Sequence, residues 1–225
     1  MIKELLRRYR IWKHARSQSD KVFIKGTLLN AFYNSKTIFI HIPKTAGVSL
    51  IKAIYGNVTL EGHRSFYFNS IILDIEDNEY FSFTFVRNPF DRLYSAYMFL
   101  RGGGMNDLDK QVFNTYLSRF IDFEDFVLNG LNNTLIFRIT HLIPQHEFLC
   151  DKKGNILVDF VGRFENLDSD INSLSVRLDK NIELNHYNSN IKKDYQDFYT
   201  PEMVDIVTRI YQKDLTIFKY KFTKC

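Results

Sequence analysis

The sequence has little cysteine and no long apolar run. Its 225 residues include two cysteines, Cys150 and Cys225, which cannot form the disulfide framework of a small secreted domain. No uncharged stretch approaches the roughly 18 apolar residues that a membrane-spanning helix needs. Residues 1–21 also lack the continuous apolar segment of a secretory signal. These absences exclude a transmembrane protein and argue against export by that route, so we expect the chain to stay in the reducing cytoplasm.

Metal-ligand spacing and a broad excess of positive charge are also lacking. No spacing of His, Cys, Asp and Glu indicates a metal site, and two lone cysteines argue against zinc, so we expect no metal. The net charge is +4, but residues 1–21 contain seven of the 30 Lys and Arg and only two of the 26 Asp and Glu. The remainder therefore has a net charge of −1. Such a chain does not have the broad basic face of a general nucleic-acid binder, so we expect no nucleic-acid partner.

The basic residues of the N-terminal segment alternate with apolar ones such as Leu5, Tyr9 and Trp12. This pattern fits a helix that packs its apolar side on the protein, and it also fits a helix that rests on anionic lipid at the inner face of the membrane. We favour packing and keep peripheral membrane contact through residues 1–21 as the alternative. The chain then divides into a basic helical segment, residues 1–35, packed on or flanking one domain, residues 36–225.

Apolar and aromatic residues are abundant, at 45% and 16% of the chain, which is enough for a substantial core in one domain. Clusters of β-branched and aromatic residues predict buried strands at residues 37–42, 80–86 and 157–164. Apolar spacing and capping residues predict helices at residues 48–55, 90–101, 108–129, from Asn166 or Asp168 to about 178, and from 201 toward 218. The alternation predicts a single α/β domain with a largely parallel central sheet flanked by helices.

Two polar loops each connect a predicted strand to a predicted helix, the first at residues 41–49 and the second at residues 87–97. Ligands of open α/β sheets bind beyond the carboxyl ends of the strands, so the two loops should converge. The first loop offers N–H groups at a helix N-terminus, a glycine, hydroxyls and Lys44, which together predict a phosphate or sulfate cradle. In the second loop, Arg87 and Ser95 lie two turns apart and suit a second phosphate.

These two loops resemble known motifs. HIPKTAG at residues 41–47 and RNPFDRLYSAY at residues 87–97 resemble the paired cofactor motifs of the sulfotransferase family, and more narrowly its carbohydrate O-sulfotransferase branch. With weaker matches further on, the resemblance runs from about residue 36 to about residue 220. It implies a P-loop-like fold and the transfer of a sulfuryl group from 3′-phosphoadenosine-5′-phosphosulfate (PAPS) to a hydroxyl of a carbohydrate or glycolipid.

The resemblance also implies cofactor-binding residues. The first motif would bind the 5′-phosphosulfate through Lys44, Thr45, Ala46, Gly47, Val48 and Ser49. Val48 stands where the family usually has threonine, which removes one hydroxyl hydrogen bond worth about 1 kcal/mol. The second motif would bind the 3′-phosphate through Arg87 and Ser95, but a structural ion pair of Arg87 with Asp91 or Glu165 is an alternative role.

Two lysines near the C-terminal end of the resemblance, Lys192 and Lys193, are further cofactor candidates. They would close over the nucleotide, whereas the alternative is that both are simply solvated.

Sulfuryl transfer needs in-line alignment and charge stabilisation more than covalent catalysis. Lys44 is therefore the predicted catalytic cation, which neutralises charge on the bridging oxygen. The acceptor hydroxyl needs a general base, and His63 resembles the histidine that serves as the base in this branch. The candidates to bind the acceptor are Arg64, His141, Gln145 and His146. Either His141 or His146 could replace His63 as the base. Glu61 and Glu165 are the remaining candidates for the base.

Two rival functions are kept. A nucleotide-dependent kinase-like enzyme would use a similar loop on ATP, but Lys44 precedes the glycine and the chain lacks the G-x-x-x-x-G-K-[ST] arrangement. A catalytically silent module would bind PAPS or its desulfated product without a base. The acceptor, the hydroxyl that is modified and the oligomeric state are not encoded in a recognisable pattern.

Overall fold

The computed structural model describes residues 2–75, 80–184 and 194–223. They form two compact units. Of the described residues, those within 1–42, 46–85 and 147–185 form the first unit, and those within 43–45, 86–146 and 186–225 form the second. Because each unit is assembled from three separate stretches of the chain, no single cut in the sequence divides them. The chain is thus not two successive domains, in agreement with the predicted single domain.

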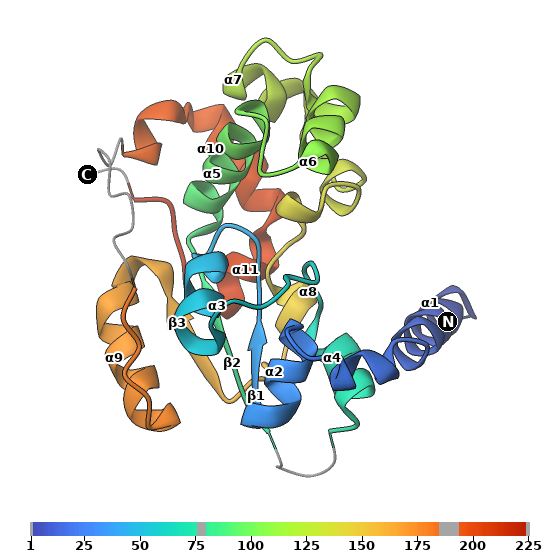
Figure 1. The fold of residues 1–225 in the computed structure, drawn as a ribbon. Coiled ribbons are helices and arrows are strands. Elements are labelled where there is room, and N and C mark those ends of the chain that lie inside the picture. The colour runs from blue at the N-terminus through green and yellow to red at the C-terminus, as the bar shows by residue number, and fades with distance from the viewer. Residues whose placement is uncertain (1, 76–79, 185–193, 224–225) are drawn as a thin grey trace. The chain divides into compact units, whose positions relative to one another are not determined.

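The first unit is built on a three-stranded sheet with the order β1-β2-β3, seen in Figure 1. The strands are β1 (Thr37–Ile40), β2 (Phe81–Val86) and β3 (Phe160–Arg163). Strands β1 and β2 pair in parallel, with Thr37 opposite Phe81 and Ile40 opposite Thr84. Asp159, just before β3, donates its N–H to the carbonyl of Ser82 and accepts from the Ser82 N–H and hydroxyl with its carboxylate. All three predicted strands are present, each shorter than its apolar run.

The first unit also contains helices. They are α1 (Ile2–Arg16), α2 (Leu28–Ser35), α3 (Gly47–Tyr55), α4 (Phe66–Leu73), α8 (His146–Leu149) and α9 (Leu167–Leu178), with 3-10 turns at Ser19–Phe23 and Phe164–Asn166. Helix α2 packs on β1 and α9 on β3. Thr27 and Ser65 cap α2 and α4 by accepting N–H bonds with their hydroxyls. The predicted α/β class, with a parallel sheet flanked by helices, is confirmed. Helix α2 lies within residues 1–35, which were predicted to be helical, whereas the sequence pattern did not predict α4.

The basic N-terminal segment forms α1, which contacts α4. Ala15 is fully buried, whereas Tyr9 and Trp12 are exposed and stack on each other with ring centroids 6.2 Å apart. This segment belongs to the same unit as the sheet. The domain boundary predicted at residue 35 stays a prediction. Within the described ranges, no helix combines the length and the apolar character needed to cross a membrane.

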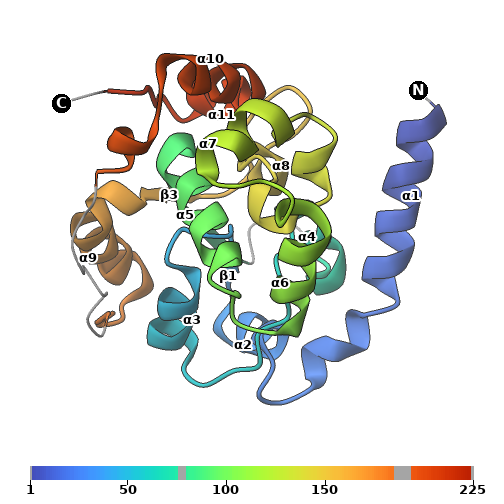
Figure 2. The same cartoon turned by 90° about the horizontal axis from the view of Figure 1, so that it is seen from above.

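The second unit is helical and is built around α5 (Pro89–Arg101). Its other helices are α6 (Asp107–Val112), α7 (Phe123–Asp125), α10 (Pro201–Ile210) and α11 (Gln212–Ile217), with π-helical turns at Phe113–Leu117 and Phe126–Gly130 and 3-10 turns at Leu135–Phe137, Thr140–Leu142 and Tyr195–Phe198. Figure 2 shows α6 beside α5. Of the residues predicted on one face of α5, Leu93, Tyr97 and Leu100 are buried, and Tyr94 is partly buried against the same core. This core also includes Phe90 and residues of α10.

The predicted helix over residues 108–129 is interrupted. Residues 118–122 form a turn between the two π-helical turns and their flanking helices. The Asp122 carboxylate accepts the N–H of Asp125, and the Asp125 carboxylate accepts the N–H of Ile121. These side-chain bonds stabilise a helix start at residue 123. The last predicted helix is likewise divided, because Tyr211 separates α10 from α11.

Candidate active site

The first candidate loop connects β1 to α3 and has an unusual backbone. Lys44 and Ala46 adopt left-handed conformations, with φ of +69° and +70°, which residues bearing a Cβ rarely adopt. Ala46 is the N-cap of α3 and offers no side-chain acceptor. Its carbonyl accepts the N–H groups of Ser49 and Leu50. In the described part of the chain, the earlier N–H groups of α3, those of Gly47 and Val48, bond to no acceptor. The start of α3 can therefore donate to an anion.

Gly47 is required by the packing of this loop in the first unit. A Cβ built on Gly47 would overlap the imidazole ring of His41, which follows β1. The His41 ring also stacks on Phe39, with centroids 5.9 Å apart. Position 47 thus has room for no side chain while His41 keeps its place, and the helix backbone approaches the strand end closely.

Lys44 belongs to the second unit, where its ammonium lies over the ring of Phe99, 3.9 Å from the centroid. No acceptor within the described residues bonds this ammonium. Burial lowers the pKa of Lys44 to about 8, the positive charge of Arg87 acts in the same direction, and the carboxylate of Asp109 opposes them. A half-buried cation that has no anionic partner in contact is suited to bind an anionic ligand.

Arg87, directly after β2, makes the ion pair that the sequence left as an alternative. Its Nε and Nη2 atoms donate to the two carboxylate oxygens of Asp91, each at 2.8 Å, and Nη1 donates to the carbonyl of Lys44 at 3.0 Å. The guanidinium therefore fixes the Lys44 loop to the first turn of α5. Ser95 lies on the same helix, half-buried. Binding of a 3′-phosphate by Arg87 stays a prediction, and this pairing with Asp91 would have to accommodate it.

Gln145 holds the backbone of Arg87. Its Oε1 atom accepts the Arg87 N–H at 2.9 Å, and its Nε2 atom donates to the Arg87 carbonyl at 2.8 Å. The side chain has no exposed surface. The buried Asp214 carboxylate in turn accepts the N–H groups of Gln145 and His146. The structure thus gives Gln145 a positioning role, and the predicted hydrogen bond from Gln145 to a sugar hydroxyl stays without structural support.

His63, the predicted base, lies in the first unit with one nitrogen fixed. Its Nδ1 atom lies 2.9 Å from the backbone carbonyl oxygen of His41, and the two imidazole rings are 4.3 Å apart. Because a carbonyl only accepts hydrogen bonds, Nδ1 must carry the proton. In the neutral ring the Nε2 atom then has the lone pair, which is the tautomer that a general base needs.

His146 is the second histidine with a fixed nitrogen, since its Nδ1 atom lies 2.6 Å from the Asp214 carboxylate. His141 lies beside Phe99, with ring centroids 5.1 Å apart, and its Nε2 atom is 4.0 Å from Asp109. Both belong to the second unit. Their predicted role in acceptor binding stays a prediction.

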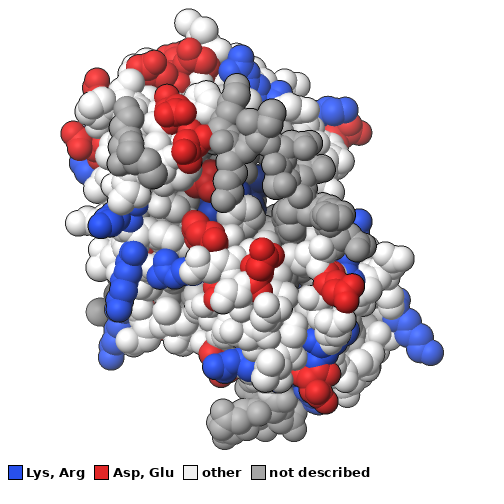
Figure 3. Space-filling view, turned by 90° about the vertical axis from the view of Figure 1, so that its left-hand side faces the viewer, with Lys and Arg blue, Asp and Glu red and all other residues white. Residues whose placement is uncertain are grey.

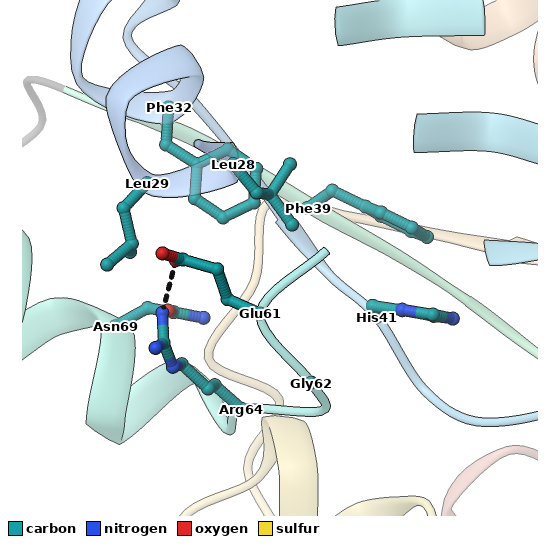
Figure 4. A pocket seen from close by; sticks show the side chains of 9 residues that line it. All are labelled: Leu28, Leu29, Phe32, Phe39, His41, Glu61, Gly62, Arg64 and Asn69. Atoms are coloured by element: carbon teal, nitrogen blue, oxygen red, sulfur yellow. Dashed lines mark hydrogen bonds and ion pairs between the residues drawn. The ribbon is translucent and has the colours of Figure 1, made fainter. Parts of the chain in front are cut away.

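Arg64, another predicted acceptor ligand, is occupied within the first unit. It forms an ion pair with Glu61 at 2.8 Å and donates to the Gln18 side chain at 2.9 Å. Figure 4 shows this pair beside a small cavity. The centre of a water molecule can occupy about 10 Å³ of this cavity, and the buried Oδ1 atom of Asn69, which lines it, has no hydrogen-bond partner among the residues that the structure describes. One buried water suits this space. The bonds of Arg64 to Glu61 and to Gln18 stabilise the loop that contains His63.

The remaining predicted site residues differ in burial. Thr45 is fully buried, whereas Val48 and Ser49 are half-buried in the first turn of α3. Lys192 and Lys193 lie outside the described residues. Sequence reasoning missed Phe99 and Asp109. Phe99 is one of many aromatic residues, and an acidic residue at a helix start is common, so neither carries a local signal.

Among the described residues, no group of three or more His, Cys, Asp and Glu side chains could hold a metal ion. On the face drawn in Figure 3, Lys and Arg side chains are interspersed with Asp and Glu.

Comparison with known proteins identifies the family. A family model described as the sulfotransferase family matches residues 33–221, which include both candidate loops, His63 and the Gln145 segment. The chain belongs to the sulfotransferase family. Searches of curated proteins and of solved structures find no match. The match makes this protein an enzyme of sulfuryl transfer and agrees with its α/β fold.

Proposed function

We propose that this sulfotransferase transfers the sulfuryl group of PAPS to a hydroxyl of a carbohydrate or glycolipid. The observation that carries the choice of an anionic donor is the Lys44 ammonium, which lies over Phe99 without an acceptor in the described part of the chain. Family members generally use PAPS, and the motifs at residues 41–47 and 87–97 resemble those of the carbohydrate branch. The acceptor class rests on that resemblance.

The residues present fit an anionic donor of this kind. The N–H groups of Gly47 and Val48 have no acceptor among the described residues, and a helix N-terminus favours negative charge. The bound donor would supply the activated sulfuryl group. Residues 44–49 would hold its 5′ end, while Arg87 and Ser95 would hold its 3′-phosphate. Val48 has no hydroxyl, so at this position only the backbone N–H would contribute.

Two side chains would carry the chemistry. Lys44 would neutralise the charge that develops on the leaving oxygen, as a cation at the reacting bond stabilises the transition state. His63 would take the proton of the acceptor hydroxyl at its Nε2 atom, because Nδ1 is fixed on the carbonyl of His41. The kinase-like rival is disfavoured by the family match. A catalytically silent module would lack a general base, whereas the tautomer of His63 is the one that a general base needs.

A binding experiment tests the donor. Calorimetric titration with adenosine 3′,5′-bisphosphate, ATP and 5′-AMP would compare wild type with Lys44→Gln and with the control Lys52→Gln, which changes an exposed lysine of α3. We expect binding of the bisphosphate in preference to the other two, weakened at least tenfold in Lys44→Gln and unchanged in Lys52→Gln. Binding of ATP without binding of the bisphosphate would refute PAPS as the donor.

We further propose a cytoplasmic location. Two cysteines among 225 residues, too few for a disulfide framework, support a reducing compartment. Peripheral contact of α1 with anionic lipid is the accompanying proposal, supported by the exposed Tyr9 and Trp12 among basic residues. Flotation of the protein with vesicles containing phosphatidylserine, compared with neutral vesicles, would test it, and equal recovery in both would refute lipid contact through charge.

A further inference from the structure

Asp109 lies in a small cluster around Phe99 in the second unit. The Lys44 ammonium is 3.9 Å from the centroid of the Phe99 ring, and the His141 ring is 5.1 Å from it. The carboxylate of Asp109 is 4.0 Å from Nε2 of His141 and acts electrostatically on Lys44. Asp109 is 9% exposed, and neither motif of the sulfotransferase family includes it.

The Asp109 side chain is held in one orientation. Its Oδ2 atom accepts the N–H of Met105 at 2.9 Å, while its own N–H is capped by the Asn106 side chain at 3.0 Å. A Cβ on Gly104 would overlap Asp109, so the glycine turn after α5 leaves space for this carboxylate. With Oδ2 bound to the backbone, Oδ1 is the oxygen that faces His141. These contacts are local to α6 and to the turn before it, and they keep a negative charge near Phe99.

We propose that Asp109 is a positioning residue for sulfuryl transfer, which keeps the Lys44 side chain positively charged over Phe99. This inference rests on the proposed function, in which Lys44 must be a cation when the donor is bound. Asp109 does not touch the ammonium, and it therefore acts through its field rather than by occupying the site that the donor needs. A carboxylate in direct contact would compete with the donor, whereas one at a distance supports the charge and leaves the ammonium accessible.

The charged groups that face Lys44 come from different elements. Arg87, from the turn after β2, is a like charge and is itself paired with Asp91. Asp109 comes from α6, and His141, from the turn at Thr140–Leu142, faces Asp109. Burial and Arg87 both favour the neutral amine and lower the pKa of Lys44 to about 8, whereas the Asp109 carboxylate opposes them and favours the charged form. Without the Asp109 carboxylate, the fraction of Lys44 in the neutral amine form would increase at physiological pH.

The test measures Lys44 directly in the free protein. Competitive acetylation with a trace of acetic anhydride at pH 6–10, followed by peptide mass spectrometry, reports the neutral fraction of each lysine. We expect a Lys44 midpoint near 8 in wild type. In Asp109→Asn, which retains an oxygen for the Met105 N–H, the midpoint should fall by roughly half a unit to one unit, with up to about tenfold more Lys44 acetylation at pH 7. An unchanged midpoint in folded Asp109→Asn would overturn the proposal.

A matched control is Asp107→Asn, which removes the same charge from the same helix at a side chain that is 91% exposed. The Lys44 midpoint should not move in this variant, and an equal shift in both variants would contradict a specific role of Asp109. If Asp109→Asn fails to fold, judged by circular dichroism, Asp109→Ser carries the same expectation. His141→Gln removes the other titratable group beside Asp109 and should move the midpoint less than Asp109→Asn does. A shift as large as that of Asp109→Asn would place the influence on His141 instead.

A second readout separates this inference from the proposed function. The affinity for adenosine 3′,5′-bisphosphate, measured from pH 6 to pH 9, should fall on the alkaline side, and in Asp109→Asn the fall should begin at lower pH. If the acetylation midpoint shifts but the bisphosphate does not bind at any pH, the proposed donor is wrong and the electrostatic role of Asp109 stands. If the bisphosphate binds with the same pH profile in both proteins, the positioning role is refuted and the donor stands.

Discussion

The Nδ1 atom of His63 lies 2.9 Å from the carbonyl oxygen of His41. His41 directly follows the strand that leads to the Lys44 loop, so the predicted base is anchored to the backbone that precedes the predicted catalytic cation. The anchor is a main-chain group, and it therefore persists whatever side chain occupies position 41. It fixes both the tautomer and the direction of the His63 ring.

His63→Ala is expected to lower kcat by about 10²–10⁴ while leaving the affinity for adenosine 3′,5′-bisphosphate unchanged. The reason is that proton removal from the acceptor is lost, whereas the anion-binding groups remain. Turnover is measured with radiolabelled PAPS on an acceptor found by screening saccharides and glycolipids. His146→Ala is the matched comparison, because the Nδ1 of His146 is fixed by Asp214. A larger loss of kcat in His146→Ala than in His63→Ala would transfer the role of base to His146.

Gly47→Ala is expected to destabilise the protein by about 1–3 kcal/mol, because the new methyl group would overlap the His41 ring. The free energy of unfolding is measured by urea titration. His41→Ala in the same chain should restore part of the loss, since it removes the ring and retains the carbonyl that binds His63. Gly102→Ala serves as the control, with φ of −76° and no atom closer than 3.3 Å to the added Cβ. Equal destabilisation in both single variants would contradict a specific clash at residue 47.

Lys44→Met is expected to stabilise the fold at pH 7 by about 1–3 kcal/mol while abolishing donor binding. The pKa of Lys44 in the folded protein is about 8, mainly because of burial, against an ordinary value of 10.5. Between these values the unfolded chain binds more protons, so the contribution of Lys44 to stability rises with pH, and below pH 8 the full penalty is present. Urea titrations at several pH values should show the advantage of the variant shrinking toward pH 10. The exposed Lys52→Met should show little change.

Gln145→Leu is expected to destabilise the protein by about 2–5 kcal/mol, because the N–H and carbonyl of Arg87 would lose the bonds that Gln145 makes with them. Bisphosphate affinity should fall as well, since the turn that bears Arg87 would lose its fixed shape. Calorimetry and urea titration measure the two effects. Gln212→Leu, at an exposed position of α11, should leave both unchanged. Full stability in Gln145→Leu would show that another group satisfies the Arg87 backbone.

The strands and the helix after each candidate loop could be predicted from the sequence because their patterns are local. β-Branched and aromatic runs mark β1 and β2, and the apolar spacing of α5 follows its buried face. The break within residues 108–129 could not be foreseen, since it depends on bonds of Asp122 and Asp125 that a periodicity does not contain. Helix α4 is mostly apolar, and its two polar residues, Asn69 and Ser70, do not mark a helical face, so its sequence also suits a strand.

In the candidate site, too, the features with a local sequence pattern could be predicted, and those that depend on distant residues could not. The two loops are recognisable because their residues are contiguous, and their glycine, lysine and arginine have defined uses. The partners of those residues come from distant segments: Gln145 is 58 residues from Arg87, and Asp109 lies on another helix than Phe99. Only the folded chain places a buried carboxylate near Lys44 and gives the Gln145 amide a structural use.

The bonds from Asp214 to Gln145 and from Gln145 to Arg87 also bear on the order of events during synthesis. Arg87 emerges from a ribosome long before Gln145, and Gln145 precedes Asp214 by a further 69 residues. The backbone of the Arg87 turn therefore acquires its full set of partners only after residue 214 has been translated. A chain that terminates after residue 97 but before residue 214 would contain both sulfotransferase motifs and still lack the carboxylate that holds the Gln145 backbone. In such a chain the N–H groups of Gln145 and His146 would lack the acceptor that Asp214 provides.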